Sequence, residues 1–191
     1  MDCGVTRAGF VLVGGNSSRM GRDKARLPIA GGTLVERVAH AVSAAAGSVT
    51  LVGAPERYGG LGFRVLADTR LAAGPLAGIH TALSASPAYW NLIVACDMPG
   101  ISASFLRSLL DAAEASAADC LRPAGPSGFP EPLCAVYHTR CAETIGAALD
   151  RNVRKVTDGL AGLRVATWCV AEGGWFRNVN TPEEWAQYTH E

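Results

Sequence analysis

The sequence predicts an α/β fold in which a mostly parallel central sheet lies between two layers of helices. Short apolar segments alternate with longer segments whose apolar residues recur at helical spacing. The short segments are apolar on both faces and are bounded by Gly, Pro or Asp, which is typical of parallel strands covered on both sides. This alternation favours parallel strands joined by right-handed crossovers.

The expected elements follow one another in this alternating order. Strands are expected at Gly9–Val13, Ser48–Val52, Phe63–Leu66, Asn91–Cys96, Cys120–Arg122, Leu133–Tyr137 and Leu163–Val170. Helices are expected at Thr33–Ala46, Leu76–Ala85, Ser102–Ala115, Thr139–Leu149, Val153–Leu160 and from Pro182 onward. Thr33 is placed to cap the first helix, and Glu36 is its capping-box partner three residues later.

Length and composition limit the possible functions. A chain of 191 residues, 49% of them hydrophobic, suits one domain spanning residues 1–191. Its 17 basic and 17 acidic side chains cancel, so no overall charge draws it to nucleic acid or to an anionic membrane. The first apolar run, Phe10–Val13, is too short for a signal peptide or a membrane span. Because the six cysteines form no CxxC pair, we expect reduced thiols and a cytoplasmic protein.

The segment after the first expected strand, Gly14–Lys24, has the composition of a polyphosphate-binding loop. Its glycines allow a ligand to approach the backbone, while Arg19 offers a planar fork and Lys24 a mobile point charge. Two known phosphate motifs are absent, because Ala25 follows Lys24 where a P-loop has Ser or Thr, and Asn16 replaces the second glycine of GxGxxG. The alternative is a plain tight turn with solvated charges.

Two aspartates stand at the ends of expected strands. Asp97 comes after Asn91–Cys96, where a carboxylate would face the ligand crevice and could bind Mg²⁺ together with substrate phosphates. Asp68 closes the expected strand Phe63–Leu66. The nearby Gly74–Gly78 segment suggests a backbone that passes close to a flat ligand. For both aspartates, the alternative is a carboxylate that only caps a turn.

Near the C-terminus, Asn178 and Asn180 alternate on an extended segment and so share one face, where they could hold a polar substrate. A turn in which Thr181 caps the last helix is equally compatible with this segment. The four histidines show no metal-binding spacing, and no serine lies in a GxSxG elbow, so acyl transfer is unsupported.

Five segments together resemble the molybdenum cofactor guanylyltransferases, a branch of the Rossmann-like nucleotidyltransferases. They are LVGGNSSRMGRDKA, GPLAGIHTAL, CDMP, EPLCAVY and NVNTPEE, and they span nearly the whole chain in the family's order. The resemblance implies a nucleotide-binding part at about 8–118 and a pterin-side elaboration at about 119–191. It also implies that the terminal phosphate of molybdopterin, which carries molybdenum, attacks the α-phosphate of GTP and releases pyrophosphate.

The resemblance assigns roles by motif. Arg19, Lys24 and Asp97 would be catalytic, with Asp97 also the ligand of a Mg²⁺ cofactor. GTP would be bound by Leu12, Val13, Gly14, Gly15, Lys24, Asp68, Gly78 and Asp97. The pterin would be bound by Pro132, Arg154, Asn178 and Asn180. Transient contact with a cofactor-delivery or acceptor protein is implied as well.

Two positions depart from the family pattern. Val13 replaces the usual alanine, which is harmless if only the backbone is used, and Gly53 stands where some members carry an asparagine near the base. The guanine preference is therefore open, and the alternative enzymes use CTP on molybdopterin or another NTP on a phosphorylated sugar or alcohol. A nucleotide sensor without turnover is disfavoured because Arg19, Lys24 and Asp97 are all present.

Overall fold

The computed structural model describes residues 6–14, 23–29, 31–70, 73–171, 174–176, 179, 184–185 and 187. Its centre is a seven-stranded sheet in the order β5-β4-β1-β6-β8-β7-β9. The strands are β1 (Arg7–Leu12), β4 (Thr50–Val52), β5 (Arg64–Leu66), β6 (Trp90–Ala95), β7 (Cys120–Ala124), β8 (Cys134–His138) and β9 (Val165–Cys169). All seven expected strands are present, with shifts at their ends.

The sheet is parallel except at one strand. β1 pairs in parallel with both β4 and β6, and β7 pairs in parallel with β9. β8 runs antiparallel to both of its neighbours, β6 and β7. All strands of this sheet except β8 therefore end at the same edge, and β8 begins at that edge. The expectation of a mostly parallel sheet is confirmed.

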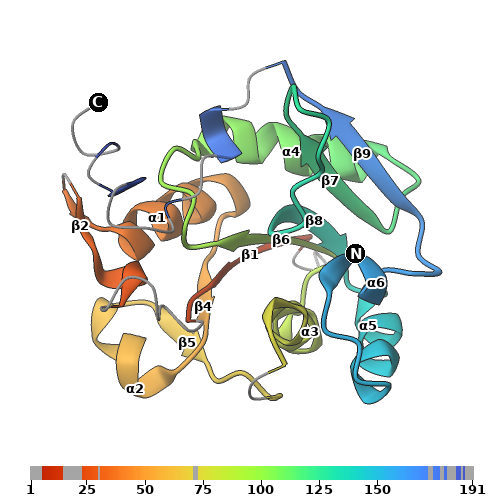
Figure 1. Cartoon of the computed structure of the whole chain (residues 1–191), viewed down its shortest axis with the longest axis horizontal. Coiled ribbons are helices and arrows are strands. Elements are labelled where there is room, and N and C mark those ends of the chain that lie inside the picture. The colour runs from red at the N-terminus through yellow and green to blue at the C-terminus, as the bar shows by residue number, and fades with distance from the viewer. Residues whose placement is uncertain are drawn as a thin grey trace, which may run out of the picture.

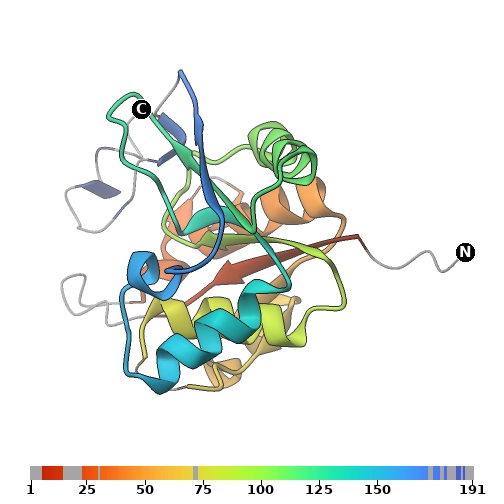
Figure 2. The same cartoon turned by 90° about the vertical axis from the view of Figure 1, so that its right-hand side faces the viewer.

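Helices cover both faces of this sheet (Figures 1 and 2). On one face lie α1 (Leu34–Ala46) and α4 (Ala103–Ala115), and on the other lie α3 (Pro75–Ala85), α5 (Cys141–Asp150) and the short α6 (Val156–Gly159). Neighbouring residues of β1 show the division, because Val11 belongs to the core under α1 and Phe10 to the core under α3. The three-layer expectation is confirmed.

Several helical details differ from the sequence prediction. The expected helix at Val153–Leu160 shrinks to α6, and the helix expected from Pro182 lies mostly outside the described residues. The Thr33 backbone N–H donates to Glu36 Oε2 at 2.8 Å, as the capping box requires. Unpredicted elements are η1 (Lys24–Arg26), the hairpin of β2 (Pro28–Ile29) and β3 (Gly32–Thr33), α2 (Pro55–Tyr58), η2 (Gly59–Leu61) and η3 (Gly174–Phe176).

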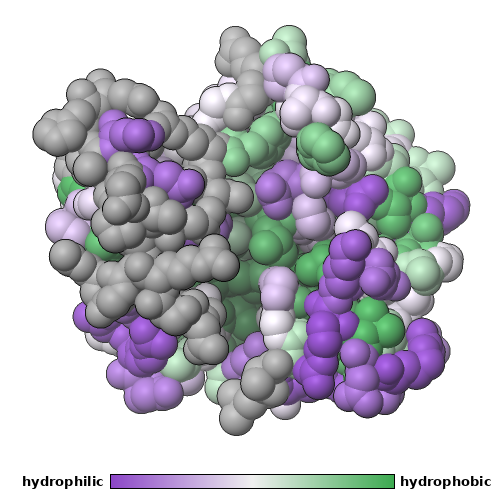
Figure 3. All heavy atoms as spheres, viewed as in Figure 1, coloured by the Kyte–Doolittle hydropathy of each residue, from purple (hydrophilic) through white to green (hydrophobic). Residues whose placement is uncertain are grey.

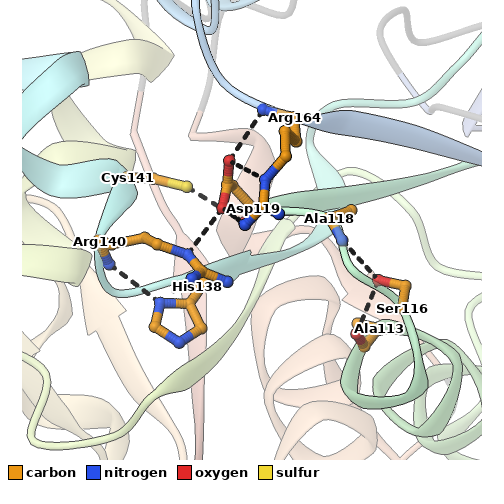
Figure 4. Close-up of polar contacts among 8 residues, drawn as sticks. All are labelled: Ala113, Ser116, Ala118, Asp119, His138, Arg140, Cys141 and Arg164. Carbon is orange, nitrogen blue, oxygen red and sulfur yellow. Dashed lines mark hydrogen bonds and ion pairs between the residues drawn. The ribbon is translucent and has the colours of Figure 1, made fainter.

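An aspartate joins β7, β8 and β9 at the edge where β7 and β9 begin (Figure 4). Asp119 is only 7% exposed, and its Oδ1 lies 2.7 Å from Arg140 Nε and 3.0 Å from Arg164 Nη2. Its main-chain oxygen accepts from the His138 N–H at 2.8 Å and from Cys141 Sγ at 3.1 Å. Hydrogen bonds from Arg164 hold the pKa of the Asp119 carboxyl below its usual value.

The one-domain expectation for residues 1–191, and its division near residue 118, stays a prediction. The seven-stranded sheet does include strands from both parts of that division. None of the helices in the described part of the chain combines the length and the hydrophobicity that a membrane span needs.

Candidate active site

A cavity of about 690 Å³ opens where β1, β4 and β6 end. Figure 3 shows hydrophobic residues at the bottom of a recess in the middle of this face, with hydrophilic residues to its right. The lining residues are Leu12, Val13, Gly14, Asp23, Lys24, Ala25, Val52, Arg57, Asp68, Gly74, Pro75, Gly78, Ala95, Cys96, Asp97 and Leu133. This position agrees with the rule that ligands bind outside the carboxyl ends of parallel strands.

Most of the predicted nucleotide-site residues meet in this cavity. Those that line it are Leu12, Val13, Gly14, Lys24, Asp68, Gly78 and Asp97. Gly15, Arg19, Asn178 and Asn180 lie outside the described residues, so their roles stay predictions. Pro132 and Arg154 are described but do not line this cavity. Each is next to a residue that does: Pro132 precedes Leu133 in the chain, and the Arg154 carbonyl oxygen lies close to Gly74.

The chain leaves β1 through a turn built on backbone contacts. The Val13 N–H donates to the Val52 oxygen at 2.9 Å, and Gly14 has φ +112°, a conformation that favours glycine. Gly53 passes so close that a Cβ there would lie 2.3 Å from the Val13 carbonyl oxygen. An asparagine therefore does not fit at position 53 on this backbone, and the departure from the family pattern has a steric reason.

Lys24 and Asp97 form an ion pair in this cavity. Lys24 Nζ lies 2.9 Å from Asp97 Oδ2, and the two side chains are 14% and 23% exposed. Asp97 lies two residues after the end of β6, and its carbonyl oxygen accepts from the Val179 N–H at 3.0 Å. Its second carboxylate oxygen, Oδ1, is buried and receives no hydrogen bond from the described residues. A lysine and a part-buried carboxylate are thus placed together where phosphates and a cation could bind.

A metal site here would need ligands from the substrate. No group of three or more His, Cys, Asp or Glu side chains within the described ranges could hold a metal ion. The free lone pairs of Asp97 Oδ1 nevertheless suit Mg²⁺, which is commonly bound by one or two carboxylates plus substrate phosphates. The donor set therefore fits a cation that arrives with a nucleotide.

Asp68 caps a turn and lines the cavity at the same time. Its Oδ1 accepts from the Arg70 N–H at 3.0 Å and from Thr81 Oγ1 at 3.2 Å. The two alternatives for this residue are therefore compatible.

Beside Asp97, burial raises the pKa of the Cys96 thiol to about 12, so this cavity cysteine stays protonated and is a poor nucleophile.

Sequence reasoning missed Arg57, which lines the cavity from α2. Its Nη2 lies 2.9 Å from Oδ2 of Asp23, which also lines the cavity. The available signal was Pro55, which occupies the first position of a helix directly after a strand. Four helical residues are too few to show a hydrophobic period, so the element itself gave no pattern.

Comparison with known proteins identifies the family. The model of the MobA-like NTP transferase domain matches residues 9–165 of this chain. The chain belongs to the MobA-like NTP transferase family. The matched range contains β4, β5, β6, β7 and β8 in full, most of β1 and only the first residue of β9, together with every described residue of the cavity.

Curated relatives and solved structures agree with this family. A probable molybdenum cofactor guanylyltransferase of Natranaerobius thermophilus is 33% identical, over 93% of this chain and 92% of the relative. The molybdenum cofactor guanylyltransferase of Xanthomonas euvesicatoria is 34% identical, over 96% and 94%. The crystal structure of molybdopterin-guanine dinucleotide biosynthesis protein A from Archaeoglobus fulgidus superposes with a TM-score of 0.83 at 27% identity, covering 96% of this chain and 97% of that one. The fold is therefore the Rossmann-like nucleotidyltransferase fold of MobA-like proteins.

Proposed function

We propose that this MobA-like protein transfers GMP from GTP to molybdenum-bearing molybdopterin and releases pyrophosphate. The observation that carries the proposal is the Lys24–Asp97 pair at the carboxyl ends of the central strands, in a cavity wide enough for a nucleotide. The names of relatives that match over more than nine-tenths of this chain support the same activity.

The proposed reaction is an in-line displacement at phosphorus. An oxygen of the terminal phosphate of molybdopterin forms a bond to the α-phosphorus of GTP, and the bond from that phosphorus to the bridging oxygen of pyrophosphate breaks. Such a transfer needs positioning and charge neutralisation rather than a covalent intermediate. The ammonium group of Lys24 would donate hydrogen bonds to the triphosphate, with Arg19 as a second cation from the same loop.

The cavity also suggests how the nucleotide and a cation are held. Asp97 would bind Mg²⁺ through its buried Oδ1, and the cation, when bound, supplies charge neutralisation on the phosphates. The backbone of Leu12–Gly14, with Gly15 beyond it, would hold the base and ribose. Gly78 lets α3 pack closely against the end of β1, because a Cβ there would lie 3.1 Å from Leu12 Cδ2. Asp68 would contact the nucleotide from the opposite side.

The pterin would bind on the side of the loop between β7 and β8. A second cavity of about 410 Å³ lies there, lined by Gly125, Pro126, Ser127, Phe129, Pro130, Glu131 and Phe176. The family resemblance proposes Pro132, Arg154, Asn178 and Asn180 as the residues that bind the pterin. A cytoplasmic location and a transient delivery or acceptor protein are part of the proposal and rest on the family alone.

Calorimetric titration with GTP, CTP, ATP and UTP, each with and without Mg²⁺, tests the proposal. We expect GTP to bind at least about tenfold more tightly than the others, a difference of about 1.4 kcal/mol. Tighter binding of CTP would contradict the guanine assignment and favour the cytidylyl alternative. Failure of all four nucleotides to bind, repeated with molybdopterin present, would contradict the transferase proposal as a whole.

A further inference from the structure

We infer that Arg57 is a positioning residue of this active site, which acts through Asp23 to hold Lys24 where the triphosphate binds. The catalytic meaning of this inference rests on the proposed function. Arg57 lies on α2, lines the cavity and has a 45% exposed side chain. None of the roles implied by the family resemblance includes it.

Asp23 is the residue through which Arg57 acts. Its Oδ2 lies 2.9 Å from Arg57 Nη2, and its Oδ1 accepts from the Tyr58 hydroxyl at 3.2 Å. Burial raises the pKa of Tyr58, so the hydroxyl stays protonated and remains a donor. Two successive residues of α2 therefore hold this carboxylate, which is 18% exposed.

The Asp23 carboxylate in turn fixes η1, the short helix that carries Lys24. Its Oδ1 accepts from the Ala25 N–H at 3.1 Å, which makes Asp23 the N-cap of η1. A three-residue 3₁₀ turn has few hydrogen bonds of its own, so its conformation depends on such a cap. The Arg26 guanidinium also donates to the Arg57 carbonyl oxygen, which ties η1 to α2 a second time.

Lys24 directly follows Asp23, the residue that caps η1. Its four-carbon side chain has many rotamers, so a fixed η1 backbone favours the conformation in which its ammonium lies 2.9 Å from Asp97 Oδ2. Loss of the Arg57 guanidinium would remove one hydrogen-bonding partner of Asp23. The backbone at Lys24 could then shift. A displacement of about 1 Å at a reacting group can cost about a hundredfold in rate.

The test compares Arg57→Ala, Arg57→Lys, Lys24→Ala and the Arg57→Ala/Lys24→Ala double variant in GMP transfer to molybdopterin and in calorimetric GTP binding. We expect Arg57→Ala to lower kcat by about ten- to a hundredfold, more than it weakens GTP affinity. Arg57→Lys should restore part of kcat, because an ammonium also pairs with Asp23. In the Lys24→Ala background, Arg57→Ala should cause no further loss of kcat or of GTP affinity, since both changes remove the same interaction.

Arg7→Ala is the matched control. Arg7 also pairs with carboxylates, Asp111 at 2.7 Å and Glu114 at 2.6 Å, but it lies where β1 begins, at the far edge of the sheet. We expect this variant to lower the melting temperature and leave kcat unchanged at temperatures well below melting. If Arg57→Ala behaves in the same way, the inference is overturned.

The remaining outcomes separate the inference from the proposed function. An equal loss from Arg57→Ala with and without Lys24 would mean that Arg57 contacts the nucleotide itself, which overturns the positioning role. A wild-type protein that binds GTP but transfers nothing would contradict the proposed function. The coupling between Arg57 and Lys24 in GTP affinity would still decide the inference in that case.

Discussion

At the scale of single residues, Asp97 carries the most specific prediction. Asp97→Asn removes the charge that suits a cation and keeps the shape of the side chain, and the Val179 hydrogen bond uses only the backbone. We expect the fold to survive and Mg²⁺-dependent turnover to fall by at least about a hundredfold, as for the loss of one transition-state contact. Kinetics at several Mg²⁺ concentrations, with circular dichroism to check the fold, measure both effects. Unchanged turnover would remove Asp97 from the metal role.

Gly53 carries a second residue-scale prediction. A Cβ at this position would meet the Val13 oxygen at 2.3 Å, so we expect Gly53→Ala to cost about 1–3 kcal/mol of stability and to weaken nucleotide binding. Gly60→Ala is the matched control, because a Cβ there meets nothing within 4 Å. Chemical denaturation and GTP titration of the two variants make the comparison. Equal stability of both variants would show that the turn after β1 adapts easily.

Residue types and motifs predicted much of this site, but not all of it. Lys24 was predicted from the glycine-rich, basic loop after the first strand, and Asp97 from its position at the end of another strand. Such positions meet at one edge of a parallel sheet. Arg57 was not found, because its role depends on contact with Asp23, 34 positions earlier in the chain. Nothing in the spacing of the two residues predicts an ion pair between elements this short.

At the scale of elements, Asp119 links the beginnings of β7 and β9 to the end of β8, and its lowered pKa gives a pH-dependent prediction. Because the pKa is lower in the folded state, the carboxylate stabilises the fold above its unfolded pKa of about 3.9 and loses this effect as pH falls through the folded value. We expect Asp119→Asn to cost about 1 kcal/mol at pH 7, a modest figure because the arginines are solvent-exposed.

Urea denaturation of wild type and Asp119→Asn between pH 3 and pH 7 measures this effect. The difference in unfolding free energy should be constant from pH 7 to about pH 5 and should shrink below about pH 4. A difference that does not change with pH would contradict a stabilising role for the charge of this carboxylate.

The elements that the sequence did not predict are all four residues long or shorter. Long helices such as α1 and α4 carry a clear apolar period, and every strand of the main sheet lies on a predicted segment. The hairpin of β2 and β3 has two residues in each strand, and α2 has four residues, so neither can show a period. The direction of β8 was not predicted individually, because an apolar run reads the same in either direction.

At the scale of the whole molecule, nucleotide binding should stabilise the entire fold. The cavity is built from β1, β4 and β6 of the central sheet and from α3, so a bound ligand holds together segments that separate on unfolding. At a GTP·Mg²⁺ concentration of about 100 times Kd, linkage predicts an increase of about 2.7 kcal/mol in unfolding free energy. A thermal shift assay should show a rise in Tm with GTP and a smaller one with CTP. Equal shifts for all four nucleotides would contradict base selectivity.

The reversed strand of the sheet has a consequence for how such enzymes can be altered. Because β8 runs against β6 and β7, residues 125–133 leave and re-enter the sheet at the same edge, as the tip of a hairpin. A hairpin tip can be lengthened, shortened or exchanged without rethreading any strand. Leu133 is the one residue of this segment that lines the cavity proposed for the nucleotide, so residues 125–132 can be exchanged without altering that lining. Grafting residues 125–132 between relatives should change the accepted phosphate compound and leave the choice of nucleotide as it was.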